Sequence, residues 1–151
     1  LLSDRLRKME LFPVGRLDRD TVGLMILTND GQTAHALLSP RRHVEKVYRF
    51  RAERPLAPGC EEKFADGLTI DGYVCKPAVL VCDPDRTGGE ITLTEGKYHQ
   101  IKRMLEAVDN RITFLERISF GGIPLDRTLS RGEYRELAEH ESLGLLSQAQ
   151  K

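Results

Sequence analysis

The sequence predicts an α+β domain with a mixed, mainly antiparallel β-sheet flanked by helices, because strand patterns alternate with single helices along the chain. Two strand patterns carry this prediction. Val22–Thr28 is an apolar run of strand length, and Lys46–Ala52 alternates between two faces. A helical pattern follows, in which apolar residues recur at the spacing i, i+3, i+4, i+7 over Ile101, Met104, Leu105 and Val108.

The first half of the chain contains two strands with a helix between them. Val22–Thr28 is apolar throughout, which predicts a strand buried on both faces of the sheet. Asp30 follows as a candidate helix cap, and the helix that it opens ends at Ser39-Pro40. Alternation in Lys46–Ala52 predicts an aromatic face with Tyr48 and Phe50 and a basic face with Arg49 and Arg51.

The second half contains further strands around two helices. Glu61–Ala65 reads as a short helix closed by Gly67. The helix with the strongest pattern is expected to carry Lys97, His99 and Lys102 in its first turn. The remaining segments predict strands at Pro77–Cys82, Glu90–Thr94, Ile112–Phe120 and Tyr134–Leu137, with a turn at Gly121-Gly122.

Length and composition fit one ordinary globular domain. The chain has 151 residues, of which 40% are hydrophobic and 30% are charged, a balance that excludes a disordered tail. No apolar run approaches the roughly 18 residues that span a bilayer, and no signal peptide opens the chain. The three cysteines form no CxxC pair, so we expect buried thiols in a reducing, cytoplasmic setting and no metal site. Because the first residue is Leu1 rather than Met, we expect a piece of a longer protein.

Charge is distributed unevenly along a chain whose net charge is zero. Residues 1–51 carry ten Lys or Arg against six acids, a net charge of +4, whereas residues 132–151 have a net charge of −2. The stretch Lys97–Arg103 carries +3 and no acid. A local basic face on a neutral protein is compatible with a polyanionic partner, and equally with scattered solvated charge.

A charged cluster precedes the first strand: Asp18 lies between Arg16 and Arg19 and is followed by Asp20. The string DRDTV has a weak resemblance to the DxDx[TV] motif of haloacid-dehalogenase phosphatases, in which the first Asp attacks phosphorus. That motif follows a long hydrophobic strand, whereas Gly15-Arg16 interrupts the apolar residues here. The chain also lacks the later Asp-Asp pair that would bind magnesium in that family. A solvated turn is the other simple reading.

A longer string resembles a different family more specifically. GRLDRDTVGLMILTNDG, over Gly15–Gly31, is similar to the signature of bacterial rRNA pseudouridine synthases of the RsuA/RluB/RluE type. The resemblance covers nearly the whole chain and continues in order through SPRRHVEKVYRF, KPAVL, EGKYHQIKRML and GGIPLD with GEYREL. The KPA segment resembles the RsuA branch, whose target is small-subunit 16S rRNA. The resemblance implies the pseudouridine-synthase catalytic fold over residues 1–151.

The resemblance also implies a catalytic set of three residues. Asp18 matches the family's nucleophilic aspartate, which acts while uracil is detached from ribose, rotated and rejoined through carbon, without cofactor or metal. A carboxylate suits this step because it can attack or stabilise an electron-poor anomeric carbon. Tyr48 matches the tyrosine that stacks on uracil and helps to remove its C5 proton. Lys102 matches the basic partner that keeps the aspartate ionised, with Arg103 as the alternative.

Ribosomal RNA is the partner that the resemblance implies, as free 16S rRNA or an assembly intermediate, for a monomeric enzyme. A uridine in folded RNA must be flipped out, and the family places an arginine, here Arg16, in the space left by the base. Further candidate RNA contacts are Arg19, Arg41, Arg42, His43, Lys46, Lys97 and Arg103. Most relatives carry an N-terminal S4 RNA-binding domain, which we expect to be absent here. A non-catalytic rRNA-binding module on the same fold is the alternative function.

Overall fold

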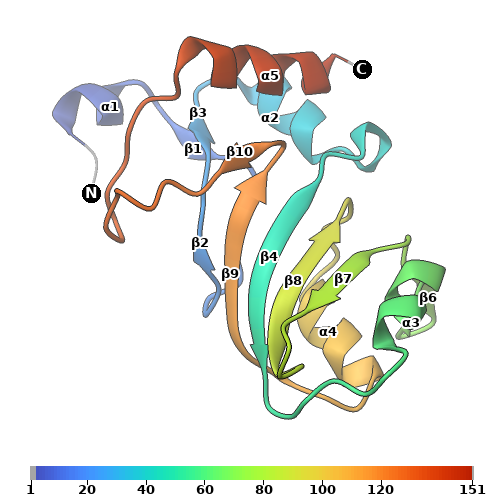
Figure 1. The fold of residues 1–151 in the computed structure, drawn as a ribbon. Helices are drawn as coiled ribbons and strands as arrows, with labels where there is room; N and C mark the ends of the chain where they lie inside the picture. Colours follow the sequence, from blue (N-terminus) through green and yellow to red (C-terminus); the bar gives the residue numbers. More distant parts are fainter. Residues whose placement is uncertain (1–2, 151) are drawn as a thin grey trace.

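A six-stranded sheet forms the centre of the structure, a computed structural model that describes residues 3–150 (Figure 1). Its strands lie in the order β10-β9-β4-β8-β7, and all neighbours in this order are antiparallel. The sixth strand, β2, pairs with β9 in parallel, so the sheet is mixed but mainly antiparallel, as predicted. The strands are β2 Val22–Gly23, β4 Lys46–Ala52, β7 Val79–Cys82, β8 Gly88–Leu93, β9 Ile112–Phe120 and β10 Ile123–Pro124.

Helices and two short ribbons surround this sheet. Figure 1 shows α1, α2 and α5 together at one end, and α3 and α4 beside β7 and β8 at the other. The helices are α1 Asp4–Lys8, α2 Gly31–Leu38, α3 Cys60–Asp66, α4 Gln100–Ala107 and α5 Glu139–Ala149, with a 3₁₀ helix, η1, at Pro40–Arg42. The ribbons pair β1 Phe12–Pro13 with β3 Leu27–Thr28, and β5 Thr69–Ile70 with β6 Tyr73–Val74.

Two hydrophobic clusters support the sheet at its two ends. The larger cluster joins the sheet to α3 and α4, and its fully buried side chains include Phe50, Phe64, Ile91, Met104 and Leu105. The smaller cluster joins α2 and α5 to the end of β9, through Val14, Leu37, Val44, Phe120 and Leu145. Burial of apolar surface is the main favourable term for folding, so each cluster stabilises its own end of the sheet.

Several predicted elements have the bounds that the sequence indicates. Lys46–Ala52 and Ile112–Phe120 are strands over those residues. The Asp30 side chain caps α2 by accepting hydrogen bonds from the backbone N–H groups of Gln32 (3.1 Å) and Thr33 (3.4 Å). Gly67 follows α3 as predicted, and Cys60 and Cys75 are buried free thiols.

The prediction of one strand over Val22–Thr28 is wrong. Its two ends belong to different sheets, and Leu27 is 39% exposed. The path changes at Gly23, whose φ of +112° and close approach to the Arg117 carbonyl exclude a side chain. Beyond it, the Arg117 guanidinium donates to the Leu24 carbonyl at 2.9 Å, while the Leu24 N–H donates to the Arg117 carbonyl. Arg117 therefore holds this segment both as its backbone partner on β9 and through its side chain.

Two further predictions are wrong. Tyr134–Leu137 is an extended segment outside any sheet, because side chains rather than a ladder hold it: Arg135 pairs with Asp126 and Glu141. The α4 helix begins at Gln100, so Lys97 and His99 precede it instead of lying in its first turn. Among residues 3–150, no helix is both long and apolar enough to cross a bilayer.

Candidate active site

A cavity of about 540 Å³ lies where three segments of the chain meet. The loop between β1 and β2 contributes Asp18, strand β4 contributes Tyr48, and the loop between β8 and α4 contributes residues 95–99. Apolar side chains complete the wall, namely Leu17, Leu93, Ile101 and Leu115. A carboxylate, an aromatic ring and an apolar wall thus share one hollow, which suits a planar, partly apolar ligand.

The backbone around Asp18 is fixed from its C-terminal side. The Thr21 N–H donates to the Asp18 carbonyl at 2.9 Å and closes a turn, after which Val22–Gly23 pairs with β9. The Asp18 side chain is 28% exposed, so it is partly shielded from water but still accessible. The loop can therefore present a carboxylate at a defined position beside the sheet.

Lys102 lies between two carboxylates. It belongs to the first turn of α4, and its Nζ lies 3.6 Å from Asp18 Oδ2 and 2.5 Å from Asp20 Oδ1. The hydrogen bond to Asp20 is the main cause that raises the pKa of Lys102, and the same bond lowers the pKa of Asp20. His99 approaches from the other side, with Nε2 at 3.7 Å from Asp18 Oδ1. The sequence predicted the pairing of Lys102 with Asp18. It did not predict that Asp20 contacts Lys102 or that His99 contacts Asp18.

Tyr48 occupies the middle of β4, opposite Ile91 on one neighbouring strand and Arg117 on the other. Its ring is half-buried and packs against the larger hydrophobic cluster, which limits its freedom. The same residue lines the cavity with Asp18, so Tyr48 is both packed against the core and accessible from the cavity. The sequence alone could not separate a core aromatic from a site aromatic, and in this structure Tyr48 is both.

Glu95 organises the loop that forms the far wall, a role that sequence reasoning missed. The side chain is buried and accepts hydrogen bonds from the Tyr73 hydroxyl (2.5 Å), the Lys76 N–H (2.8 Å) and the Gln100 amide (2.9 Å). Burial raises the pKa of Glu95, but these hydrogen bonds outweigh burial and its pKa lies below the ordinary value. The sequence feature that could have indicated this role is the single acid, Glu95, just before the basic stretch Lys97–Arg103.

The basic side chains named from the sequence fall into separate groups. Arg16, Arg19 and Lys97 line the cavity and are exposed. Arg103 instead pairs with Asp71 and donates to the Tyr98 carbonyl at 2.8 Å. Three other candidates lie outside the cavity lining, namely Arg41 and Arg42 on η1 and His43 directly after it.

Lys46 is unsuited to contact RNA, contrary to expectation. It is only 8% exposed, and its Nζ donates to the Thr94 carbonyl at 3.4 Å. Burial lowers the pKa of Lys46, with the neighbouring Arg117 acting in the same direction. Its position at the end of β4 therefore serves packing rather than phosphate binding.

One buried hydroxyl beside Asp18 has no partner. Among the buried side-chain nitrogen and oxygen atoms of residues 3–150, Thr21 Oγ1 alone lacks a hydrogen bond. Thr21 is 9% exposed, and the residue contributes to the cavity lining. A buried hydroxyl without a partner lowers the free energy of unfolding. The protein is therefore less stable with Thr21 than it would be with an apolar residue of the same shape.

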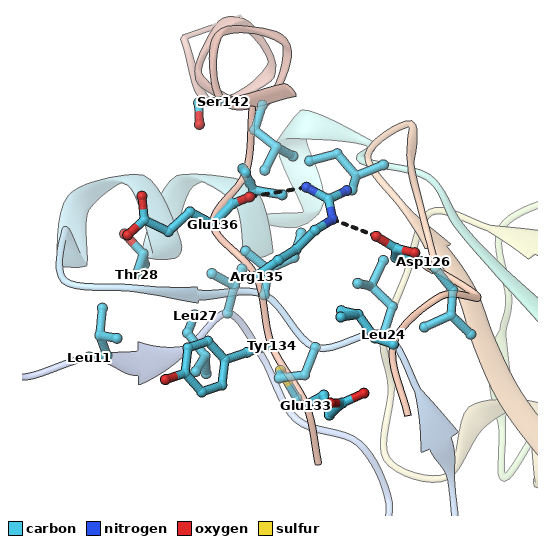
Figure 2. Close-up of a pocket in the computed structure, with 18 of the residues that line it drawn as sticks. Leu11, Leu24, Leu27, Thr28, Asp126, Glu133, Tyr134, Arg135, Glu136 and Ser142 are labelled. Atoms are coloured by element: carbon cyan, nitrogen blue, oxygen red, sulfur yellow. Dashed lines mark hydrogen bonds and ion pairs between the residues drawn. The ribbon is translucent and has the colours of Figure 1, made fainter. Parts of the chain in front are cut away.

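A larger cavity of about 840 Å³ lies on the side of α1 and α5. Figure 2 shows the extended segment with Tyr134 and Glu136 crossing it, and Arg135 directed at Asp126. Arg135 also pairs with Glu141, whose pKa it lowers to about 2. The two ion pairs of Arg135 thus join this segment to α5 and to Asp126. The smaller cavity, with its accessible carboxylate, is therefore the candidate active site.

Comparison with known proteins gives consistent matches. A family model described as RNA pseudouridylate synthase matches residues 1–107. The RNA pseudouridine synthase YtzG of Bacillus subtilis is 44% identical over 99% of this chain and 64% of its own length. Ribosomal small subunit pseudouridine synthase A of Escherichia coli K12 is 46% identical over 87% of this chain and 58% of its own length.

A solved structure supports the same grouping. A crystal structure of a pseudouridylate synthase matches with a TM-score of 0.90 and 38% identity, over 95% of this chain and 63% of that one. The chain thus has the α+β pseudouridine-synthase fold and belongs to the RNA pseudouridylate synthase family. It spans about three fifths of the length of these relatives.

Proposed function

We propose that this chain converts a uridine of small-subunit ribosomal RNA to pseudouridine, with Asp18 as the nucleophile. The observation that carries the proposal is that Asp18 and Tyr48 line one cavity, with the Lys102 ammonium 3.6 Å from the Asp18 carboxylate, in a chain from this family. One chain supplies all three side chains. The proposed site is therefore complete within a monomer.

The proposed chemistry follows from the properties of these groups. Asp18 attacks or stabilises the anomeric carbon as the bond from ribose to uracil N1 breaks. Uracil rotates, its C5 bonds to the same ribose carbon, and the C5 proton is lost while N1 gains one. Lys102 is the cationic partner of the carboxylate, and Tyr48 holds the uracil ring and takes part in proton removal. The reaction uses no cofactor or metal.

The proposed substrate is an RNA in which the uridine is flipped out. Arg16, Arg19 and Lys97 are exposed cations around the cavity, where they can contact phosphates on both sides of an extruded nucleotide. Similarity to synthases whose name specifies the ribosomal small subunit favours 16S rRNA. Action on this RNA would place the protein in the cytoplasm.

A non-catalytic RNA-binding module is the alternative function. Binding of phosphate would gain nothing from a carboxylate in the middle of the basic side chains, because like charges repel. The presence of Asp18 between Arg16, Arg19 and Lys102 therefore favours catalysis.

Tritium release tests this proposal directly, since loss of the C5 proton accompanies each turnover. Small-subunit and large-subunit rRNA transcripts labelled with tritium at uracil C5 are incubated separately with the chain. Release from the small-subunit transcript, with pseudouridine mapped to a defined position, supports the proposal. Binding without release on both transcripts would favour the binding module, and release from the large-subunit transcript alone would overturn the substrate assignment.

A further inference from the structure

Tyr98 is presented at the mouth of the cavity with 77% of its surface exposed. Exposed aromatic rings on a basic surface are the usual means by which proteins hold unpaired nucleobases. Among residues 3–150, no hydrogen bond to the Tyr98 hydroxyl is present, so the ring is not held there by its polar end. Most of the Tyr98 ring is therefore free to contact a ligand.

One face of the ring is covered by His99. The two ring centroids are 3.8 Å apart and the planes differ by 15°, which is a stacked arrangement. His99 itself lies with Nε2 at 3.7 Å from Asp18 Oδ1. The stack therefore starts at the proposed nucleophile and leads outward to Tyr98, whose other face is available to a ligand.

The loop that carries Tyr98 is fixed by hydrogen bonds on both sides. Gln100 accepts from the Lys97 N–H at 2.9 Å and donates to Glu95 at the same distance. Arg103 donates to the Tyr98 carbonyl at 2.8 Å, and His99 adopts a φ of +49° that is uncommon for a side-chain-bearing residue. The ring is thus held outward by the fold, and binding to it costs little ordering of the loop.

Cations line the same cavity as this ring. Lys97, the preceding residue, lines the cavity and lies with its Nζ 4.6 Å from the centre of the Tyr73 ring. Arg16 and Arg19 line the same cavity from the opposite loop. An aromatic surface flanked by exposed Lys and Arg fits a single strand, in which each base is followed by a phosphate.

We propose that Tyr98 is a stacking platform for the nucleobase next to the target uridine in the RNA strand. The uridine enters the cavity beside Asp18 and Tyr48, and its neighbour continues the stack on the free face of Tyr98. This inference rests on the proposed function only in taking RNA as the ligand. Stacking tolerates any base, so Tyr98 contributes affinity and positions the strand, with little preference for sequence.

Equilibrium binding to short RNAs tests the platform. The probes are nine-nucleotide single strands with a central uridine and 2-aminopurine on its 5′ or 3′ side, together with versions whose flanking sites are abasic. Loss of one base stack corresponds to roughly a tenfold weaker Kd. Tyr98→Ala should show this loss and lose the quenching of 2-aminopurine, whereas Tyr98→Phe should keep both. Tyr134→Ala, in the larger cavity, is the matched control and should bind as the wild type does.

The abasic probes identify stacking as the cause. The wild type should bind them about as weakly as Tyr98→Ala binds the complete RNA, and the substitution should cause no further loss. Equal affinity of Tyr98→Ala and wild type for the complete RNA would overturn the platform. So would a loss of affinity on substitution that is as large for abasic RNA as for complete RNA. Turnover is measured separately by tritium release. Stacking without turnover would refute the proposed function alone, and turnover with an unchanged KM in Tyr98→Ala would refute the platform alone.

Discussion

Lys102→Met removes the cation beside the proposed nucleophile while keeping a side chain of similar length. The Nζ atom lies 3.6 Å from Asp18 Oδ2, and the two side chains are 22% and 28% exposed. Coulomb's law at this distance gives about 1 kcal/mol in bulk water and about 5 kcal/mol at an effective dielectric constant of 20. Partial exposure favours the lower part of this range. We expect a loss of about 1 to 3 kcal/mol, or roughly 5- to 150-fold in kcat/KM.

Single-turnover tritium release from small-subunit rRNA measures this loss. Lys102→Arg keeps a cation and should retain more activity than Lys102→Met. Arg103→Met is the informative comparison, because Arg103 pairs with Asp71 and the Tyr98 carbonyl instead of Asp18. It should weaken RNA binding more than it slows the reaction at saturating RNA. A Lys102→Met rate within twofold of wild type, or a larger loss of that saturated rate in Arg103→Met, would refute the assigned pairing.

Three further outcomes are expected. Asp20→Asn removes the main cause of the raised pKa of Lys102, so the alkaline decline in rate should begin at a lower pH than in wild type; identical pH–rate profiles would contradict this. Thr21→Val replaces an unpartnered buried hydroxyl, so urea unfolding should show unchanged or up to about 1 kcal/mol greater stability, and a clear loss would mean that the hydroxyl has a partner. RNA affinity should fall with salt at a log–log slope of about −2, from three cavity cations, and a slope beyond about −4 would require further contacts such as Arg41 and Arg42.

Strands with a clear pattern were predictable from the sequence, and those shaped by distant side chains were not. Lys46–Ala52 alternates and pairs on both sides, so local pattern and tertiary structure agree. Val22–Thr28 is the more apolar of the two segments, yet the chain leaves the sheet after Gly23, where Arg117, far along the sequence, bonds to the Leu24 backbone. Tyr134–Leu137 was also predicted as a strand, but ion pairs of Arg135 hold it outside the sheet.

The candidate site divides in the same way. The motifs predict that Asp18, Tyr48 and Lys102 act together. In the structure Asp18 and Tyr48 line one cavity, and the Lys102 ammonium lies 3.6 Å from Asp18. The closer contact of Lys102 with Asp20 depends on the turn after Asp18, which no residue pattern specifies. The outward position of Tyr98 likewise depends on hydrogen bonds of its loop to Glu95, Gln100 and Arg103.

Asp18→Asn tests the central claim most directly, because it removes the nucleophile while changing the shape of the side chain very little. Tritium release and pseudouridine mapping on small-subunit rRNA are compared for this variant and the wild type. Circular dichroism and RNA affinity serve as controls for folding and binding. We expect Asp18→Asn to fold, to bind RNA and to lose at least about 10⁴-fold in rate. Activity within tenfold of wild type would contradict the central claim.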